Sequence, residues 1–168
     1  MVFFNRLLLF STFLTLCVVV FGAYVRLTDA GLGCPDWPGC FGTLTVPESE
    51  IAIKEAQTSY PGSVVEVGKA WIEMIHRYLA GILGLLVLLI TVIAYKIRDE
   101  IRVKFILPLS ILVLITFQAA LGMWTVTELL KPIIVTAHLI GGMTILGLLT
   151  YMTHRHNGAV SNIIIINS

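Results

Sequence analysis

The sequence predicts an all-α integral membrane protein, folded as a bundle of four transmembrane helices with one sizeable external loop. Of its 168 residues 57% are hydrophobic and 12% are charged, and the mean hydropathy is +0.93. These values lie far from those of a soluble globular protein. The apolar residues are gathered into four stretches, each near the roughly 20 residues that cross a hydrocarbon core of about 30 Å. We expect residues 1–156 to form one membrane domain and residues 157–168 to form a tail.

The first apolar stretch runs from Leu7 to Val25, which is 19 residues without a charge, and it predicts a helix over about residues 7–25. No Ala-x-Ala-type cleavage site follows it, so we expect a retained helix and not a signal peptide. Cys17 lies within this stretch, and we expect it to be a small apolar packing residue.

An external loop is predicted over residues 26–69. Its first part contains two prolines and several glycines, which forbid a helix there and favour tight turns. The apolar residues between Glu48 and Tyr60 allow a short surface helix, which Pro61-Gly62 would end.

Three further helices complete the bundle. The second apolar stretch has 18 uncharged residues up to Tyr95, and its helix also takes in the charged cluster before them, so we expect it over about residues 70–95. The third and fourth helices are expected over about 105–127 and 132–153, and the fourth contains one histidine, His138.

Basic residues predict how the bundle lies in the membrane. Lysines and arginines gather before the first helix, between the second and third, and after the fourth, as Arg6, Lys96, Arg98, Arg102, Lys104 and Arg155. The positive-inside rule makes these segments cytoplasmic. The loop 26–69 has three basic and six acidic residues, a net charge of −3, and belongs outside with the short connection that holds Glu128 and Lys131. We therefore expect a multi-pass plasma-membrane protein with both termini cytoplasmic, and the overall charge of +1 indicates no nucleic-acid partner.

Three ionisable residues stand at the start of the second helix: Glu73, His76 and Arg77. The spacing of i, i+3 and i+4 puts them on one helical face, and ionisable groups in a span are costly enough to mark a site. Glu73 and Arg77 favour a local ion pair, in which Arg77 only neutralises Glu73 or reaches the interface. Alternatively, Arg77 binds a haem propionate and Glu73 faces the reacting edge as a base or a cation stabiliser.

His76 and His138 are expected at the same depth. His76 lies about 6 residues beyond Ala70 and His138 about 7 beyond Lys131, and both helices run in the same direction. At 1.5 Å per residue both imidazoles lie roughly 9–11 Å below their helix starts. A porphyrin between them could take one imidazole on each face. A lone membrane histidine would instead hydrogen-bond a carbonyl.

Small and polar neighbours accompany the histidines. Ala80, Gly84, Gly141 and Gly142 leave room for a flat macrocycle, or else they let the helices approach closely. Gln118 reaches the same depth and could line the pocket, although an interhelical hydrogen bond is its ordinary role.

Two cysteines, Cys34 and Cys40, lie in the external loop, where a disulfide can persist. They enclose a short segment containing proline, tryptophan and glycine. The pair could be a structural staple, or a redox-active pair that hands electrons or thiol chemistry to the site below.

Taken together, these residues resemble the heme A synthase family, which makes the haem of terminal oxidases. The resemblance rests on five segments spread over most of residues 1–153: Gly22–Thr28, Cys34–Cys40, Glu73-x-x-His76-Arg77, Ala120–Thr127 and the helix of His138. It implies oxidation of a methyl group of haem O to a formyl group, through hydroxylated intermediates. His76 and His138 would then match haem ligands, Glu73 an essential carboxylate, and Cys34 with Cys40 the external cysteine pair.

The resemblance also sets expectations about cofactors and partners. The usual family member has two tandem four-helix halves, each with a histidine pair, whereas this sequence holds one. Half-length forms assemble as oligomers, so we expect a homo-oligomer that binds haem O as substrate, with haem B possible, beside membrane lipid, haem O synthase and an electron donor. The alternatives are an inactive half of a split or truncated synthase, a b-type cytochrome passing electrons between quinol and a partner, and a thiol–disulfide oxidoreductase.

Overall fold

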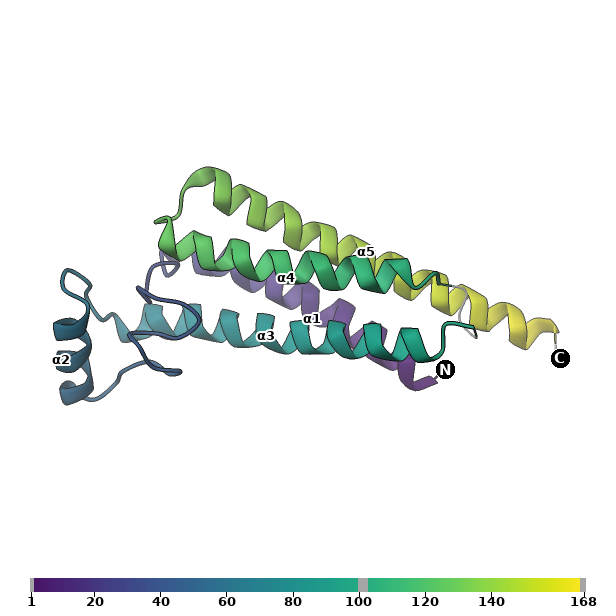
Figure 1. Cartoon of the computed structure of the whole chain (residues 1–168), viewed down its shortest axis with the longest axis horizontal. Helices are drawn as coiled ribbons and strands as arrows, with labels where there is room; N and C mark the ends of the chain where they lie inside the picture. Colours follow the sequence, from purple (N-terminus) through teal and green to yellow (C-terminus); the bar gives the residue numbers. More distant parts are fainter. Residues whose placement is uncertain (1, 100–102, 167–168) are drawn as a thin grey trace.

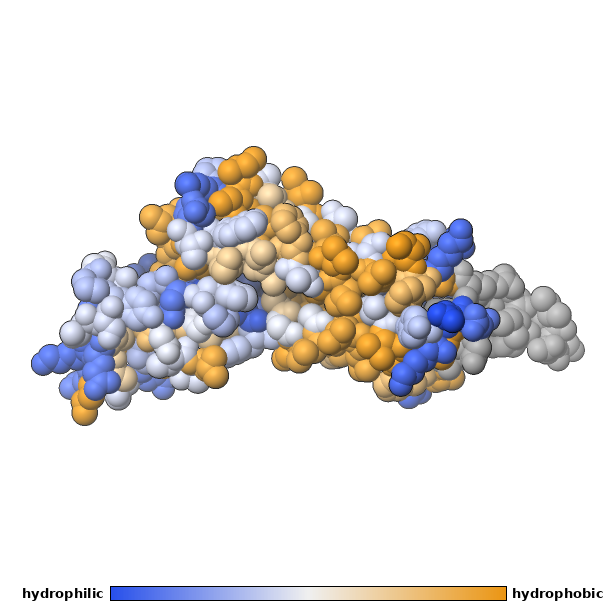
Figure 2. All heavy atoms as spheres, in the orientation of Figure 1, coloured by the Kyte–Doolittle hydropathy of each residue, from blue (hydrophilic) through white to orange (hydrophobic). Residues whose placement is uncertain are grey.

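A computed structural model describes residues 2–99 and 103–166 of the chain, with side chains as far as His156. It consists of five helices: α1 (Val2–Leu27), α2 (Glu50–Ser59), α3 (Val67–Lys96), α4 (Ile106–Thr127) and α5 (Pro132–Ile166). All except α2 are long and apolar enough to cross a membrane. The expected all-α membrane bundle is therefore confirmed. Figure 2 shows a belt of apolar residues between two polar ends of the molecule.

The four long helices form a closed square. α1 packs against α3 and α5, and α4 packs against the same two helices, so α3 and α5 occupy diagonally opposite corners. Both termini lie at one end of the bundle, which we call the terminal end (Figure 1). The segment 28–66, which includes α2, lies beyond the other end, which we call the loop end.

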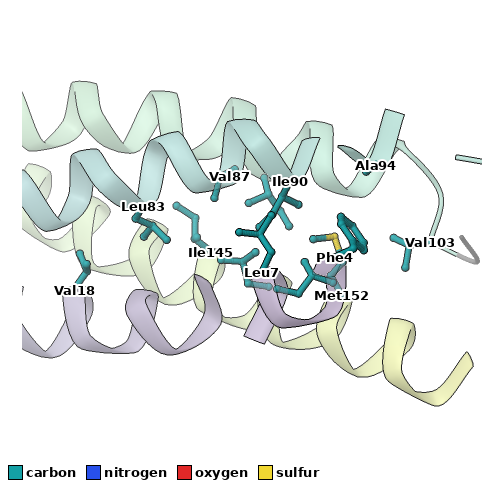
Figure 3. Packing of buried hydrophobic residues seen from close by; sticks show 13 residues of the cluster. Phe4, Leu7, Val18, Leu83, Val87, Ile90, Ala94, Val103, Ile145 and Met152 are labelled. Carbon is teal, nitrogen blue, oxygen red and sulfur yellow. The ribbon is translucent and has the colours of Figure 1, made fainter. Parts of the chain in front are cut away.

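Packing is densest at the terminal end. Side chains from all four long helices form one buried cluster there, among them Leu8, Val87, Ile90, Ile111, Ile145 and Leu149 (Figure 3). A second, smaller cluster lies under the loop and contains Cys34, Cys40, Phe41, Val46, Ala56, Ala70 and Met74. Between these two clusters α5 has no buried residue from Pro132 to Thr144. At the loop end, α5 therefore contributes no buried side chain to the core of the bundle as far as Thr144.

Helix α2 agrees with the short surface helix expected between Glu48 and Tyr60. Ser49 caps it, because its Oγ accepts a hydrogen bond from the Ala52 N–H at 3.2 Å. Gly62 follows with a φ of +89°, a left-handed conformation that favours glycine. The predicted stop at Pro61-Gly62 is therefore confirmed.

The membrane helices extend beyond their expected limits. α1 begins at Val2, α3 begins at Val67, and α5 runs past Thr153 to Ile166. A stretch without charged residues shows which part of a helix suits the hydrocarbon core of the membrane. The helix itself continues until its backbone hydrogen bonds are interrupted. The expected domain limit at residue 156 is not marked by any break in α5. Arg102 and the side chains of the expected tail lie outside the described residues.

Candidate functional site

The charged face of α3 is buried under the external loop. Glu73 is only 4% exposed, and its Oε1 forms an ion pair with Nη2 of Arg77. Its other oxygen, Oε2, accepts a hydrogen bond from the Cys34 backbone N–H at 3.0 Å. The ion pair expected from the i, i+4 spacing is thus present within α3, and the hydrogen bond from Cys34 ties Glu73 to the loop.

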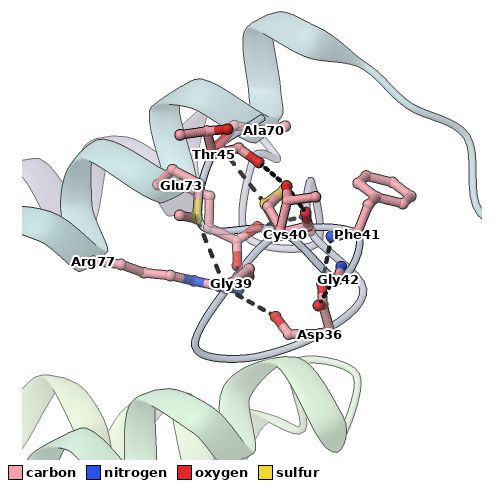
Figure 4. Close-up of a disulfide and its surroundings, with 12 residues drawn as sticks. Asp36, Gly39, Cys40, Phe41, Gly42, Thr45, Ala70, Glu73 and Arg77 are labelled. Atoms are coloured by element: carbon pink, nitrogen blue, oxygen red, sulfur yellow. Dashed lines mark hydrogen bonds and ion pairs between the residues drawn. A yellow bond between two sulfur atoms is a disulfide. The ribbon is translucent and has the colours of Figure 1, made fainter. Parts of the chain in front are cut away.

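Arg77 binds the loop through the loop's backbone carbonyl oxygens. Its Nη1 donates to the carbonyl oxygens of Asp36 at 2.8 Å and Pro38 at 3.3 Å, and also to that of Gly39 (Figure 4). A guanidinium is the one side chain that can serve several acceptors at once while pairing with a carboxylate. The expected bond from Arg77 to a haem propionate stays a prediction, since these contacts point the Nη1 donor toward the loop.

The loop itself is closed by a disulfide between Cys34 and Cys40, whose Cα atoms are 4.8 Å apart. Both cysteines are fully buried against α3. Gly33 makes this approach possible, because a Cβ there would lie 2.7 Å from the Ala70 backbone nitrogen. The close packing of the disulfide against α3 agrees with a structural staple. A redox role for the cysteine pair stays a prediction.

Asp36 organises the same loop, a role that the sequence analysis missed. Its carboxylate accepts hydrogen bonds from the N–H groups of Phe41 at 2.6 Å and Gly42 at 2.8 Å, and from the Tyr60 hydroxyl at 3.3 Å. Partial desolvation, and next the Asp36 charge, raise the pKa of Tyr60. An aspartate within a proline- and glycine-rich turn often accepts hydrogen bonds from nearby backbone N–H groups. The sequence therefore contained a signal for this role of Asp36.

The two histidines come from α3 and α5, which lie at diagonally opposite corners of the bundle. Each Nδ1 is buried and has no hydrogen-bond partner in the described part of the chain. These nitrogens therefore do not make the carbonyl hydrogen bond expected of an ordinary membrane histidine.

The donor set suits haem better than a bare metal ion. No group of three or more His, Cys, Asp or Glu residues that could hold a metal ion occurs within residues 2–99 and 103–166. Two imidazoles from diagonally opposite helices would instead suit the two axial positions of a haem. His76 and His138 thus fit the group that the sequence analysis assigned to them.

The polar and small residues expected near the histidines differ in what they contact. Gln118 donates to the His138 carbonyl, which confirms the interhelical hydrogen bond as its role. Gly141 and Gly142 both lie against Gln118, so they serve close approach of α4 and α5. Gly84 has no atom within 4 Å of its missing Cβ.

Residues 5–163 match the family model described as cytochrome oxidase assembly protein. The chain belongs to this family. It is 52% identical over 141 residues to the heme A synthase of Shewanella oneidensis, which covers 84% of this chain and 42% of that protein. It is 29% identical over 143 residues to the heme A synthase of Oceanobacillus iheyensis, which covers 85% and 41%. A third heme A synthase, from Lysinibacillus sphaericus, is 30% identical over 135 residues, covering 80% and 39%.

Family membership confirms the resemblance drawn from the motifs. The segment matched by the family model contains Cys34, Cys40, Glu73, His76, Arg77 and His138, the whole expected site. The chain spans about 40% of the length of these three relatives.

Proposed function

We propose that the chain is a heme A synthase-type oxidoreductase that oxidises a methyl group of haem O to a formyl group, giving haem A for terminal oxidases. The placement of His76 and His138 on diagonally opposite helices of the bundle carries the proposal. Membership of a family whose named relatives are heme A synthases supports it.

His76 and His138 would hold the iron of the haem, and Arg77 is a further candidate for its propionates. When bound, the haem supplies the methyl group to be oxidised and an iron that can carry electrons. Conversion of the methyl group to a formyl group replaces two hydrogen atoms by one oxygen atom, a four-electron oxidation that releases four protons when the oxygen comes from water. The reaction therefore needs an electron acceptor and an oxygen source.

Glu73 is proposed as the catalytic carboxylate. It lies one helical turn from His76, and the Cys34 N–H and Arg77 hold both of its oxygens. Bonds of this kind stabilise the charged form of a carboxylate and fix its direction. A fixed anion next to the substrate would stabilise developing positive charge or accept a proton.

We also propose a setting and partners for this activity. The distribution of Lys and Arg favours a plasma membrane with both termini cytoplasmic, which puts the histidines and the disulfide loop in the outer half. The relatives are longer than the matched segment. A second four-helix unit, supplied by another copy of the chain in a homo-oligomer, would complete a similar assembly, with haem O synthase as donor of substrate and a separate electron carrier.

A b-type cytochrome that only transfers electrons is the second candidate. Two axial histidines serve it equally well, and the Glu73–Arg77 pair has enough loop partners to be purely structural. An inactive half of a synthase would look the same. A thiol–disulfide oxidoreductase is less favoured, because both cysteines are fully buried.

Haem analysis separates these functions. The full chain is expressed in a host that makes haem O and lacks a heme A synthase, and the pigments of the membranes and of the purified protein are identified. Formation of haem A is expected. Bound haem B without haem A would establish the cytochrome, bound haem O without haem A the inactive half, and the absence of haem would favour the thiol enzyme.

A further inference from the structure

The bundle consists of two similar hairpins, α1 with α3 and α4 with α5. Each runs from the terminal end to the loop end and back, and exchanging α1 with α4 and α3 with α5 preserves every helix contact. The sequence repeats as well, since Ile82–Leu86 and Ile145–Leu149 both read Ile-Leu-Gly-Leu-Leu. His76 precedes the first copy by six residues and His138 precedes the second by seven. The two histidines therefore hold equivalent places in an approximate two-fold arrangement.

The same exchange relates two glycines that face the histidines. A Cβ on Gly22 of α1 would lie 2.9 Å from Cε1 of His76, 3.4 Å from its Nε2 and 3.6 Å from its Nδ1. A Cβ on Gly122 of α4 would lie 3.3 Å from Cε1 of His138 and 4.0 Å from both ring nitrogens. In each hairpin the glycine is closest to the Cε1 edge of the imidazole.

These contacts differ from ordinary close packing of helices. A Cβ on Gly33 would meet the backbone of Ala70, and one on Gly141 would meet the Gln118 amide. For Gly22 and Gly122 the three nearest atoms all belong to an imidazole ring. Each glycine thus leaves space for a ring and not for a neighbouring helix backbone.

An imidazole that ligates a metal is normally oriented by a hydrogen bond from its second nitrogen. Here the Nδ1 atoms of both histidines have no such partner among the described residues. Something else must then limit rotation of each ring about its side-chain bonds. The glycine backbone against the Cε1 edge is the contact that both hairpins share.

We propose that Gly22 and Gly122 are positioning residues, which set the orientation of the His76 and His138 rings by direct packing. The proposal rests on the proposed function, in that the two histidines are haem ligands. Replacing either glycine by a residue with a Cβ turns or displaces the ring and changes the axial ligation.

The two positions are expected to differ in sensitivity. The gap at Gly22 is the smaller one, and the Phe21 ring lies nearly parallel to that of His76, at 15° with centroids 6.4 Å apart. The residue equivalent to Phe21 is Leu121, so no aromatic ring occupies the corresponding position in the second hairpin. His76 is therefore confined on two sides and has less freedom to yield when Gly22 gains a methyl group.

The test uses Gly22→Ala and Gly122→Ala in the full chain, produced in membranes that supply haem. Gly147→Ala is the matched control, because it makes the same change in helix propensity at an exposed site with no atom within 4 Å. Haem content and the electron paramagnetic resonance spectrum of the oxidised low-spin iron are measured, since that spectrum depends on the angle between the two imidazole planes. Affinity for haem is expected to fall by about tenfold in Gly22→Ala, at the lower end of what outer-shell partners contribute. The g values should shift in both variants, more in Gly22→Ala.

Wild-type haem content and spectra in both glycine variants would overturn the proposal. So would an equal change in Gly147→Ala, which would show a general effect of helix stiffening. His76→Ala and His138→Ala are measured alongside: if they keep the low-spin signal, the ligand assignment itself is wrong and the glycine proposal falls with it. Circular dichroism checks that each variant folds. If Gly22→Ala fails to fold, Gly122→Ala decides, because its 3.3 Å contact requires only a small shift.

Discussion

At the scale of single residues, Glu73 offers the sharpest test of chemistry against structure. Glu73→Gln keeps an oxygen that can accept from the Cys34 N–H but removes the charge that pairs with Arg77. We expect haem content to persist and the rate of haem A formation to fall by about 100-fold, the lower range for a positioned acid or base. The rate is measured by haem extraction over time. A normal rate would leave Glu73 with only its structural ion pair.

The histidine pair predicts a loss that is specific to position. His76→Ala or His138→Ala removes one axial ligand, so the low-spin spectrum of two-histidine haem should disappear in either variant. His154→Ala is the control, since this exposed histidine lies in the same helix, sixteen residues beyond His138. Visible spectroscopy of the purified proteins checks the outcome, and unchanged spectra in both single variants would contradict the assignment.

The sequence predicted these residues better than their surroundings. Glu73, His76 and Arg77 share a face because helical spacing is regular, and the Gln118 hydrogen bond followed from its depth. The carbonyls that converge on Arg77 and the carboxylate contacts of Asp36 could not be predicted, because a loop's backbone directions depend on its tertiary path. The contact of Gly22 with His76 joins residues more than fifty positions apart and has no periodic signature.

At the scale of elements, the disulfide loop is expected to depend on Asp36. Asp36→Ala removes the acceptor for two backbone N–H groups and for Tyr60, and hydrogen bonds to a charged group contribute about 1.5–3 kcal/mol each. The loop should open more often, so dithiothreitol should reduce the Cys34–Cys40 bond roughly tenfold faster, given that about 1.4 kcal/mol corresponds to tenfold. Timed alkylation with mass spectrometry measures this rate.

Asp29→Ala controls for the loss of a carboxylate, because Asp29 pairs only with exposed Arg26 in this part of the structure. An unchanged reduction rate in Asp36→Ala would mean that contacts with α3 alone hold the loop. Mass mapping without reductant should find Cys34 joined to Cys40 and Cys17 free. Two free thiols in the loop would contradict the bridge.

The existence of each helix followed from hydropathy, but its ends did not. α5 shows why: the apolar stretch stops near Thr153, and the helix continues through the polar residues that follow. Hydropathy reports which residues suit lipid, and the helix itself requires only that no residue interrupts its hydrogen bonds. α2 was found more accurately, because Ser49 and Gly62 provide local start and stop signals.

At the scale of the whole molecule, stability and haem binding are expected to separate along the bundle. Leu149 is fully buried in the cluster at the terminal end. Leu149→Ala should lower the stability of the bundle by about 2–5 kcal/mol, the range for such truncations, while the haem spectrum stays unchanged. Thermal unfolding in detergent and visible spectroscopy measure the two effects. A spectrum altered as strongly as in Gly22→Ala would mean that the two ends of the bundle are coupled.

Assembly is the last property that belongs to the whole molecule. Gly81 of α3 and Gly147 of α5 have no atom within 4 Å of their missing Cβ positions, so both offer small, open sites on the outer surface of the bundle. In lipid, helices associate where small residues let backbones approach, and closed symmetric self-assembly is the commonest result. We expect native mass spectrometry in mild detergent to find two or three copies of the 18.5 kDa chain with haem bound. Gly147→Leu should weaken this assembly and leave the ligation spectrum intact, because the added side chain meets nothing within the bundle. A monomer that carries haem and forms haem A would refute the homo-oligomer, and an inactive monomer would support a half that needs a different partner.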